Sequence, residues 1–136
     1  GQQDQQEGRE YGLGHDDERA QACAQLLREW SQALYSFLRN GKDWFARTGA
    51  KGAVDRPLAQ ALLLHLQREL CAVLAGRAQS ELGLLLQERL DLSRLHRLDA
   101  ALVQAQEALY IGNSGVNPAL VLDWLATRLF QWLRQA

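Results

Sequence analysis

The chain has 136 residues, of which 47% are hydrophobic and 23% are charged, and its formal net charge is -1. This length fits one ordinary domain with one hydrophobic core, and the composition excludes a disordered chain. The low net charge excludes a global attraction to nucleic acid or to anionic membranes, so any such contact would have to be local.

The apolar runs and the cysteines bear on the solubility and the cellular compartment of the protein. Polar residues interrupt even the most apolar run, 58–74, so no segment resembles a signal peptide or a membrane span. Cys23 and Cys71 lie 48 positions apart on apolar helix faces, which favours buried free thiols over a disulfide framework. We therefore expect a soluble, cytoplasmic protein. Because the sequence contains no methionine, we also expect it to belong to a longer gene product or to follow a removed tag.

The amino-terminal residues predict a linker followed by a helix start. Residues 1–14 are rich in glycine and glutamine and lack a helical stripe, which predicts a flexible linker or tag remnant before a helical domain over 15–136. The carboxylates of Asp16, Asp17 and Glu18 are expected in the first turn of that domain. There they complement the helix dipole, which explains them better than an acid–base pair does.

Two helices are expected before residue 50. The first carries apolar residues at the three-and-four spacing of an amphipathic helix: Cys23, Leu26, Leu27, Trp30, Leu34, Phe37 and Leu38. Asn40 and Gly41 are expected to end it, because both residues tolerate the left-handed conformation. Asp43 can then cap a short helix that Gly49 ends.

The next segment predicts a central helix and a shorter one. Asp55 is a capping residue, Pro57 fits the first turn, and Gly76 fits the position after the end. Leucines occupy nearly every side of this helix, so we expect it at the centre of a bundle. A shorter helix follows around 80–90, although Gly83 lowers its helix propensity.

The last two helices have the clearest boundaries. Asp91 can cap a helix that ends at Gly112, and Asn117 can cap the final helix with Pro118 at its first position. The first of these helices has a narrow apolar seam formed by Leu95, Leu98, Leu102, Ala105 and Leu109. Since no strand pattern occurs, the predicted fold is all-α, a single bundle of about five or six helices.

The loop GNSGVNP over 112–118 raises the question of a phosphate site. Such a site needs converging backbone N–H groups and usually a lysine. This loop has no lysine, and Pro118 removes one of the N–H groups that an anion would use. A helix rather than a strand precedes it. The loop therefore predicts a tight turn between two antiparallel helices.

The sequence contains no arrangement of residues that predicts catalysis or a metal site. His15, His65 and His96 lack the spacing of metal ligands on one helix face, so neither a metal nor another cofactor is expected. His65 is expected to be a hydrogen-bonded core histidine rather than to share a metal with Cys71. The chain is therefore not expected to be an enzyme.

Two groups of residues are candidates for contacts with partners. Arg94 and Arg97, with His96, form a small basic patch, which favours a solvated face or a protein contact over DNA. On the final helix, Leu120 and Trp124 lie near Arg128 and outside the main apolar stripe. That stripe consists of Val121, Leu122, Leu125, Leu129, Trp132 and Leu133. A tryptophan and a leucine beside an arginine are typical of an interface anchor, but a helix buried on two sides within its own domain fits equally well.

Residues 90–133 resemble the end of bacterial DNA polymerase III clamp-loader subunits, above all the delta-prime subunit. The matching features are a Ser-Arg-Leu helix start, a long helix, a short loop, and an Asn-x-x-Leu pattern followed by leucines and an arginine. In this sequence the matching residues are Ser93, Arg94, Leu95, Asn117, Leu120, Leu122, Leu125, Arg128 and Leu129. The helices expected upstream fit the same domain in order and length.

The resemblance implies a non-catalytic collar domain that holds the loader pentamer together for sliding-clamp loading in DNA replication. The AAA+ modules of such subunits would lie upstream. The implied partners are sister loader subunits, bound without direct nucleic-acid or membrane contact, and the isolated domain is expected to be monomeric. Two alternatives stay open, a gamma/tau collar and a stand-alone helical adaptor or regulator that binds a partner peptide.

Overall fold

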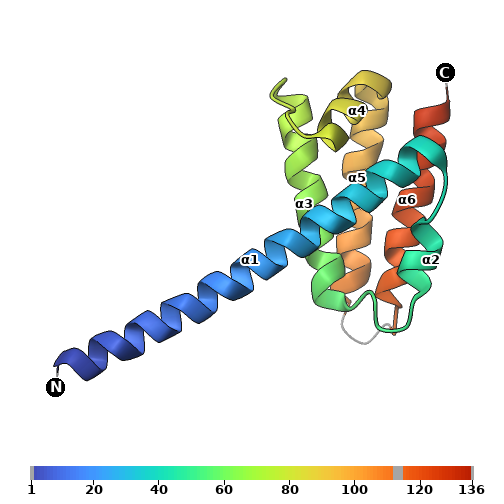
Figure 1. Cartoon of the computed structure of the whole chain (residues 1–136). Coiled ribbons are helices and arrows are strands. Elements are labelled where there is room, and N and C mark those ends of the chain that lie inside the picture. Colours follow the sequence, from blue (N-terminus) through green and yellow to red (C-terminus); the bar gives the residue numbers. More distant parts are fainter. Residues whose placement is uncertain (1, 112–114, 136) are drawn as a thin grey trace.

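The described residues of the chain form six helices arranged as one bundle (Figure 1). The structure, a computed structural model, describes the backbone of residues 2–111 and 115–135 and the side chains of 16–111 and 115–135. Its helices are α1 (Gln2–Asn40), α2 (Trp44–Gly49), α3 (Arg56–Leu74), α4 (Glu81–Arg89), α5 (Leu92–Tyr110) and α6 (Pro118–Arg134). No strand occurs in these described ranges, so the predicted all-α bundle is confirmed.

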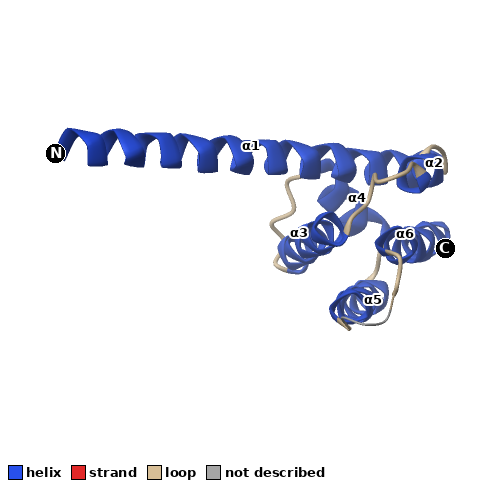
Figure 2. Cartoon of the chain, turned by 90° about the horizontal axis from the view of Figure 1, so that it is seen from below, coloured by secondary structure: helices blue, strands red, loops and turns tan. Residues whose placement is uncertain are grey.

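Three of the helices form the body of the bundle. α3, α5 and α6 run side by side, and each packs against the other two. α1 crosses one face of this group, whereas α5 lies farthest from α1 (Figure 2). α3 also contacts α1 and α4, which confirms its predicted central place. α2 packs on α6 and α1.

Side-chain caps define where four of the helices begin. A side-chain oxygen of each capping residue accepts a hydrogen bond from a backbone N–H in the first turn, which satisfies a group that the helix itself leaves unpaired. The pairs are Asp55 with Leu58, Ser80 with Gly83, Asp91 with Arg94, and Asn117 with Ala119, at 2.8–3.0 Å. Pro118 occupies the first turn of α6, as Pro57 does in α3. The predicted caps at Asp91 and Asn117 are confirmed.

The turns around α2 are built differently from the prediction. α1 ends at Asn40, and Gly41 adopts a φ of 74°, as expected for a left-handed terminator. Asp43 precedes α2 but has a φ of 71°, and its side chain accepts no capping hydrogen bond from the described backbone. A capping residue needs an extended backbone to bring its side-chain oxygen over the first N–H groups. The predicted cap at Asp43 is therefore wrong.

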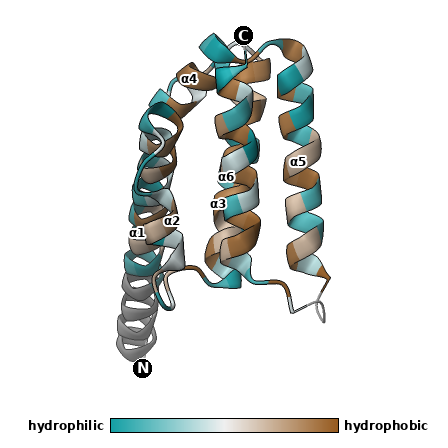
Figure 3. Cartoon of the chain, turned by 90° about the vertical axis from the view of Figure 1, so that its right-hand side faces the viewer, coloured by the Kyte–Doolittle hydropathy of each residue, from teal (hydrophilic) through white to brown (hydrophobic). Residues whose placement is uncertain are grey.

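The core lies between the apolar faces of the helices. Figure 3 shows apolar and polar segments alternating along α5 and α6, with α1 and α2 on the far side of the bundle from α5. The predicted seam of α5 and the predicted stripe of α6 are buried throughout. α1 contributes four buried apolar residues from its second half, namely Trp30, Leu34, Phe37 and Leu38.

The first half of α1 differs from its prediction. Residues 2–14, expected to form a flexible linker, are helical, and Figure 1 shows this part of α1 extending past α3. Asp16, Asp17 and Glu18 consequently lie inside a helix and not at its start, and all three are exposed. Elongating an existing helix costs far less than nucleating one, so the packed second half of α1 can extend into a polar stretch rich in glutamine and glutamate.

Both cysteines are free, but neither is buried. Cys23 belongs to an exposed stretch of α1, over 16–26. Cys71 lies on the side of α3 where Leu64 is also exposed, beside a surface hollow. Because α3 is apolar on nearly every side, its periodicity cannot indicate which side its neighbours leave uncovered. The expectation of buried thiols is therefore wrong.

Candidate functional site

A ridge of large side chains runs along the exposed side of α6. Leu120, Trp124 and Arg128 follow one another at intervals of four residues, which places them on one face of the helix. Leu120 is 62% exposed and Trp124 is 37% exposed. The guanidinium carbon of Arg128 lies 5.7 Å from the centroid of the Trp124 ring. We call these three residues the α6 ridge.

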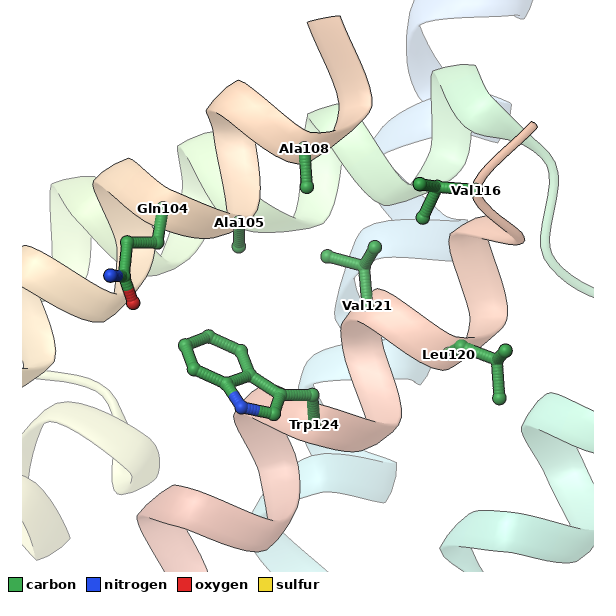
Figure 4. A pocket seen from close by; sticks show the side chains of 7 residues that line it. All are labelled: Gln104, Ala105, Ala108, Val116, Leu120, Val121 and Trp124. Atoms are coloured by element: carbon green, nitrogen blue, oxygen red, sulfur yellow. The ribbon is translucent and has the colours of Figure 1, made fainter. Parts of the chain in front are cut away.

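An apolar hollow separates the α6 ridge from α5. It measures about 280 Å³, and its lining consists of Gln104, Ala105, Ala108, Val116, Leu120, Val121 and Trp124 (Figure 4). Trp124 and Val121 reach toward α5, whereas Leu120 points away from α5. The short side chains of Ala105 and Ala108 leave this space open. We call it the α5–α6 hollow.

A second hollow lies on the other side of the ridge. It measures about 540 Å³, and its lining includes Leu120, Trp124 and Arg128 together with Asp123, Thr127 and Gln131. Leu120 and Trp124 therefore stand between two depressions of different character, one almost entirely apolar and one with polar and charged walls.

The helix that carries the ridge is held firmly in the bundle. Oδ1 of Asp123 accepts hydrogen bonds from Nε1 of Trp44 at 3.1 Å and from Oγ1 of Thr48 at 2.7 Å. Both donors come from α2 and both are buried. Sequence reasoning missed this contact, because nothing in the pattern places α2 against the middle of α6. Since both α5 and α2 pack against α6, the ridge projects from a helix that is held in place. A rigid support of this kind suits a preorganised binding surface.

The structure brings together three of the five residues predicted for an interface. Leu120, Trp124 and Arg128 form the ridge. Arg94 and Arg97 lie in the first two turns of α5, toward its other end, and line neither hollow. The α5 residues that do line the α5–α6 hollow have small or neutral side chains, so no charge or exposed aromatic group marked them in advance.

The loop before α6 is only partly described. Gly112, for which a helix end was predicted, lies with residues 113 and 114 outside the described residues, and α5 ends at Tyr110. Gly115 has a φ of 63°, a conformation that favours glycine, and no heavy atom lies within 4 Å of the position that a Cβ would take. Val116 continues from this turn into the lining of the α5–α6 hollow.

The histidines whose side chains are described belong to no group that could hold a metal ion. His65 is not a core residue as predicted, because its side chain is 30% exposed and its Nε2 lies 3.8 Å from Oε1 of Glu69. His96 is exposed on α5, and the side chain of His15 lies outside the described residues. Within the part of the chain whose side chains are described, no group of three or more His, Cys, Asp or Glu residues could hold a metal ion.

Comparisons with known proteins identify no relative of the chain. No protein-family model, curated protein sequence or solved structure matches the chain. Among the helices that the structure describes, none combines the length and the apolar character needed to cross a membrane. The features of the chain that bear on its function are therefore the α6 ridge, its hollows and the sequence pattern of residues 90–133.

Proposed function

We propose that the chain is the collar domain of a bacterial DNA polymerase III clamp-loader subunit of the delta-prime type. It acts without catalysis, in the cytoplasm, by packing against sister subunits and so holding the loader together for sliding-clamp loading in DNA replication. The observation that carries the proposal is the exposed α6 ridge, which lies within the segment that resembles these subunits.

The composition of the ridge supports a protein interface. Tryptophan and arginine are the residue types most enriched among interface residues that carry large binding energies. Trp124 combines an exposed apolar surface with an adjacent hollow that a partner side chain can fill. Arg128, stacked on the indole, offers donors to acceptors on the partner while its charge stays at the rim.

The two hollows support assembly with different subunits over self-association. A symmetric homodimer needs one self-complementary patch, whereas a ring of different subunits uses different surfaces against different neighbours. Here an apolar depression and a polar one lie on opposite sides of the same ridge. We therefore expect the isolated chain to be a monomer.

The apolar character of the α5–α6 hollow also favours a second candidate function, that of a helical adaptor that binds a peptide of a partner protein. A gamma/tau collar is the other alternative. The adaptor would bind its peptide alone, whereas a collar domain needs the surfaces of sister subunits.

The experiment is reconstitution with one subunit left out. The chain is mixed with the loader subunits encoded in the same genome, omitting delta-prime in one mixture and gamma/tau in another, and the masses are measured by sedimentation velocity. We expect a monomer alone and a stoichiometric complex in the mixture without delta-prime. A complex only in the mixture without gamma/tau identifies the alternative subunit, and no complex in either mixture contradicts the clamp-loader role.

A further inference from the structure

Three arginines from three different helices surround a hollow at one end of the bundle. Arg39 lies in the last turn of α1, whereas Arg89 and Arg134 are the last residues of α4 and α6. They line a space of about 310 Å³ together with three leucines, Leu38, Leu85 and Leu133. This arginine hollow lies at the end of the bundle where α4 and the carboxyl terminus are found (Figure 1). It is separate from the α6 ridge.

The positions of the arginines in last helical turns explain part of their presence. Cations there complement the partial negative charge of the helix ends. Arg134 also joins α6 to α1, since its Nη1 donates to the carbonyl of Leu38 at 3.1 Å and its Nη2 to that of Arg39 at 3.3 Å. Arg134 therefore has a structural role in addition to any role in binding.

Arg39 is partly engaged as well. Its Nη1 donates a hydrogen bond to the hydroxyl group of Tyr35 at 2.9 Å. That bond raises the pKa of Arg39 above its usual value, and the charges of Tyr35, Glu81 and Glu88 raise it further. The guanidinium group thus stays charged at every physiological pH.

Arg89 has no such hydrogen-bond partner among the described residues. It is exposed and makes neither a hydrogen bond nor an ion pair with any residue that the structure describes. A guanidinium group carries five N–H donors, so most donors of the three arginines have no acceptor in the described protein. Leu38 and Leu133 are buried and Leu85 is half-buried, which gives this cluster of cations an apolar base.

We propose that the arginine hollow binds an acidic peptide segment of a partner protein, in which carboxylates flank one aliphatic side chain. Carboxylates pair with guanidinium groups through two parallel hydrogen bonds. Carboxylates at the rim of the hollow can form such pairs with its arginines. The aliphatic side chain packs on the half-buried Leu85 at the base of the hollow. This proposal does not depend on the clamp-loader role.

The surroundings favour such a peptide over nucleic acid. The carboxylates of Glu81 and Glu88 lie close enough to interact electrostatically with Arg39. The carboxyl ends of α1, α4 and α6 add partial negative charge. The positive field is therefore local, whereas binding to a nucleic-acid backbone draws on many phosphate contacts. An extended polyanion would also leave the apolar base uncovered.

The test uses fluorescence anisotropy with a short labelled peptide of aspartate and glutamate around a single leucine. We expect binding that weakens as salt is added and when the leucine of the peptide is replaced by serine. Arg89→Gln should weaken binding by about tenfold, because one charged hydrogen-bonding group is lost. Arg28→Gln, which removes an exposed arginine of α1 outside the hollow, is the charge-matched control and should change nothing.

Several outcomes would overturn the proposal. They are an absence of peptide binding, equal affinities for the Arg89→Gln and Arg28→Gln proteins, and tighter Arg89-dependent binding of a single-stranded oligonucleotide than of the peptide. Thermal unfolding followed by circular dichroism shows whether the variants keep their fold. If Arg89→Gln lowers the melting temperature, Arg39→Gln provides the second variant, and its failure to weaken binding counts against the site.

Discussion

Two tryptophans near Asp123 of α6 differ in their surroundings. Trp44 of α2 is packed in the core, whereas Trp124 of α6 is partly exposed. Trp44, on α2, is 1% exposed, and its indole N–H donates to Asp123. Its ring also meets that of Trp30 edge to face, with the centroids 5.6 Å apart. Trp124 follows Asp123 directly in the sequence, yet it is 37% exposed and its ring contacts Arg128.

The comparison shows that the apolar character of a residue does not by itself tell whether it serves folding or binding. Trp44 has its ring packed and its polar atom paired. Trp124 has an open hollow on each side. Removing Trp44 should therefore affect chiefly the free energy of unfolding, whereas removing Trp124 should affect chiefly the affinity for a partner.

The largest expected effect is that of Trp44→Ala. It leaves a cavity and deprives Asp123 of a donor, so we expect a loss of about 3 to 5 kcal/mol in the free energy of unfolding. Urea denaturation followed by circular dichroism measures this loss. Phe45→Ala, which changes the adjacent aromatic residue that is 51% exposed, is the control and should cost clearly less. Equal losses in the two variants would contradict the assignment of Trp44 to the core.

Asp123→Ala should have the next largest effect. It leaves the buried Nε1 of Trp44 without its acceptor and Oγ1 of Thr48 with only the carbonyl of Phe45, at a cost of about 2 to 3 kcal/mol in the free energy of unfolding. Asp123→Asn keeps an acceptor oxygen in the same place and should recover most of the stability. If the two variants unfold at the same urea concentration, these hydrogen bonds do not hold α2 on α6.

Gly83→Ala should destabilise the fold although alanine favours helices. A Cβ at this buried position would lie 2.9 Å from Oε2 of Glu69 and 3.0 Å from Oγ of Ser80. Because Oε2 of Glu69 accepts a hydrogen bond from Oγ of Ser80, moving it aside disrupts that bond, and crowding of this kind costs about 1 to 3 kcal/mol, which outweighs the gain in helix propensity. Thermal unfolding measures the sign of the change, and a raised melting temperature would show that Glu69 moves aside freely.

A smaller effect is expected where the loop enters α6. Asn117→Ala removes the side-chain oxygen that accepts from the N–H of Ala119, at a cost of about 1 kcal/mol. Asn117→Asp preserves an acceptor there and should keep the stability of the parent. An unchanged melting temperature for the alanine variant would show that the cap contributes nothing.

Local signals in the sequence predicted most of the bundle. The caps of α3, α5 and α6 depend on a few neighbouring residues, and the seam of α5 repeats with the helical period, so both could be read without knowing the fold. The same holds for the end of α1 at Asn40 and Gly41. These features have their causes within a few residues of chain.

The features that escaped prediction depend on contacts between distant segments. Gly83 counted against a helix, whereas Glu69 of α3 and the cap Ser80 occupy the space where a Cβ would project. The meeting of Arg39, Arg89 and Arg134 requires three helices to end at the same place, which no pattern in a single helix indicates.

The α6 ridge was predicted in part, because the helical wheel places Leu120, Trp124 and Arg128 off the core stripe. The wheel alone left two interpretations open, an interface or a second buried side. Only the packing of α5 and α2 around α6 shows that the ridge is exposed between two hollows. Arg94 and Arg97, predicted as a separate candidate patch, lie elsewhere on α5.

The most direct test of the account comes from the variant Trp124→Ala. Its free energy of unfolding should fall by clearly less than that of Trp44→Ala, since Trp124 is 37% exposed and Trp44 is 1% exposed. Its affinity for the sister subunits of the proposed clamp loader, measured by sedimentation, should fall by about 2 kcal/mol, or about thirtyfold, as for an interface hot spot. Phe45→Ala, which removes an exposed aromatic ring outside the ridge, should assemble like the parent. A Trp124→Ala protein that assembles normally, or one that unfolds, would contradict the account.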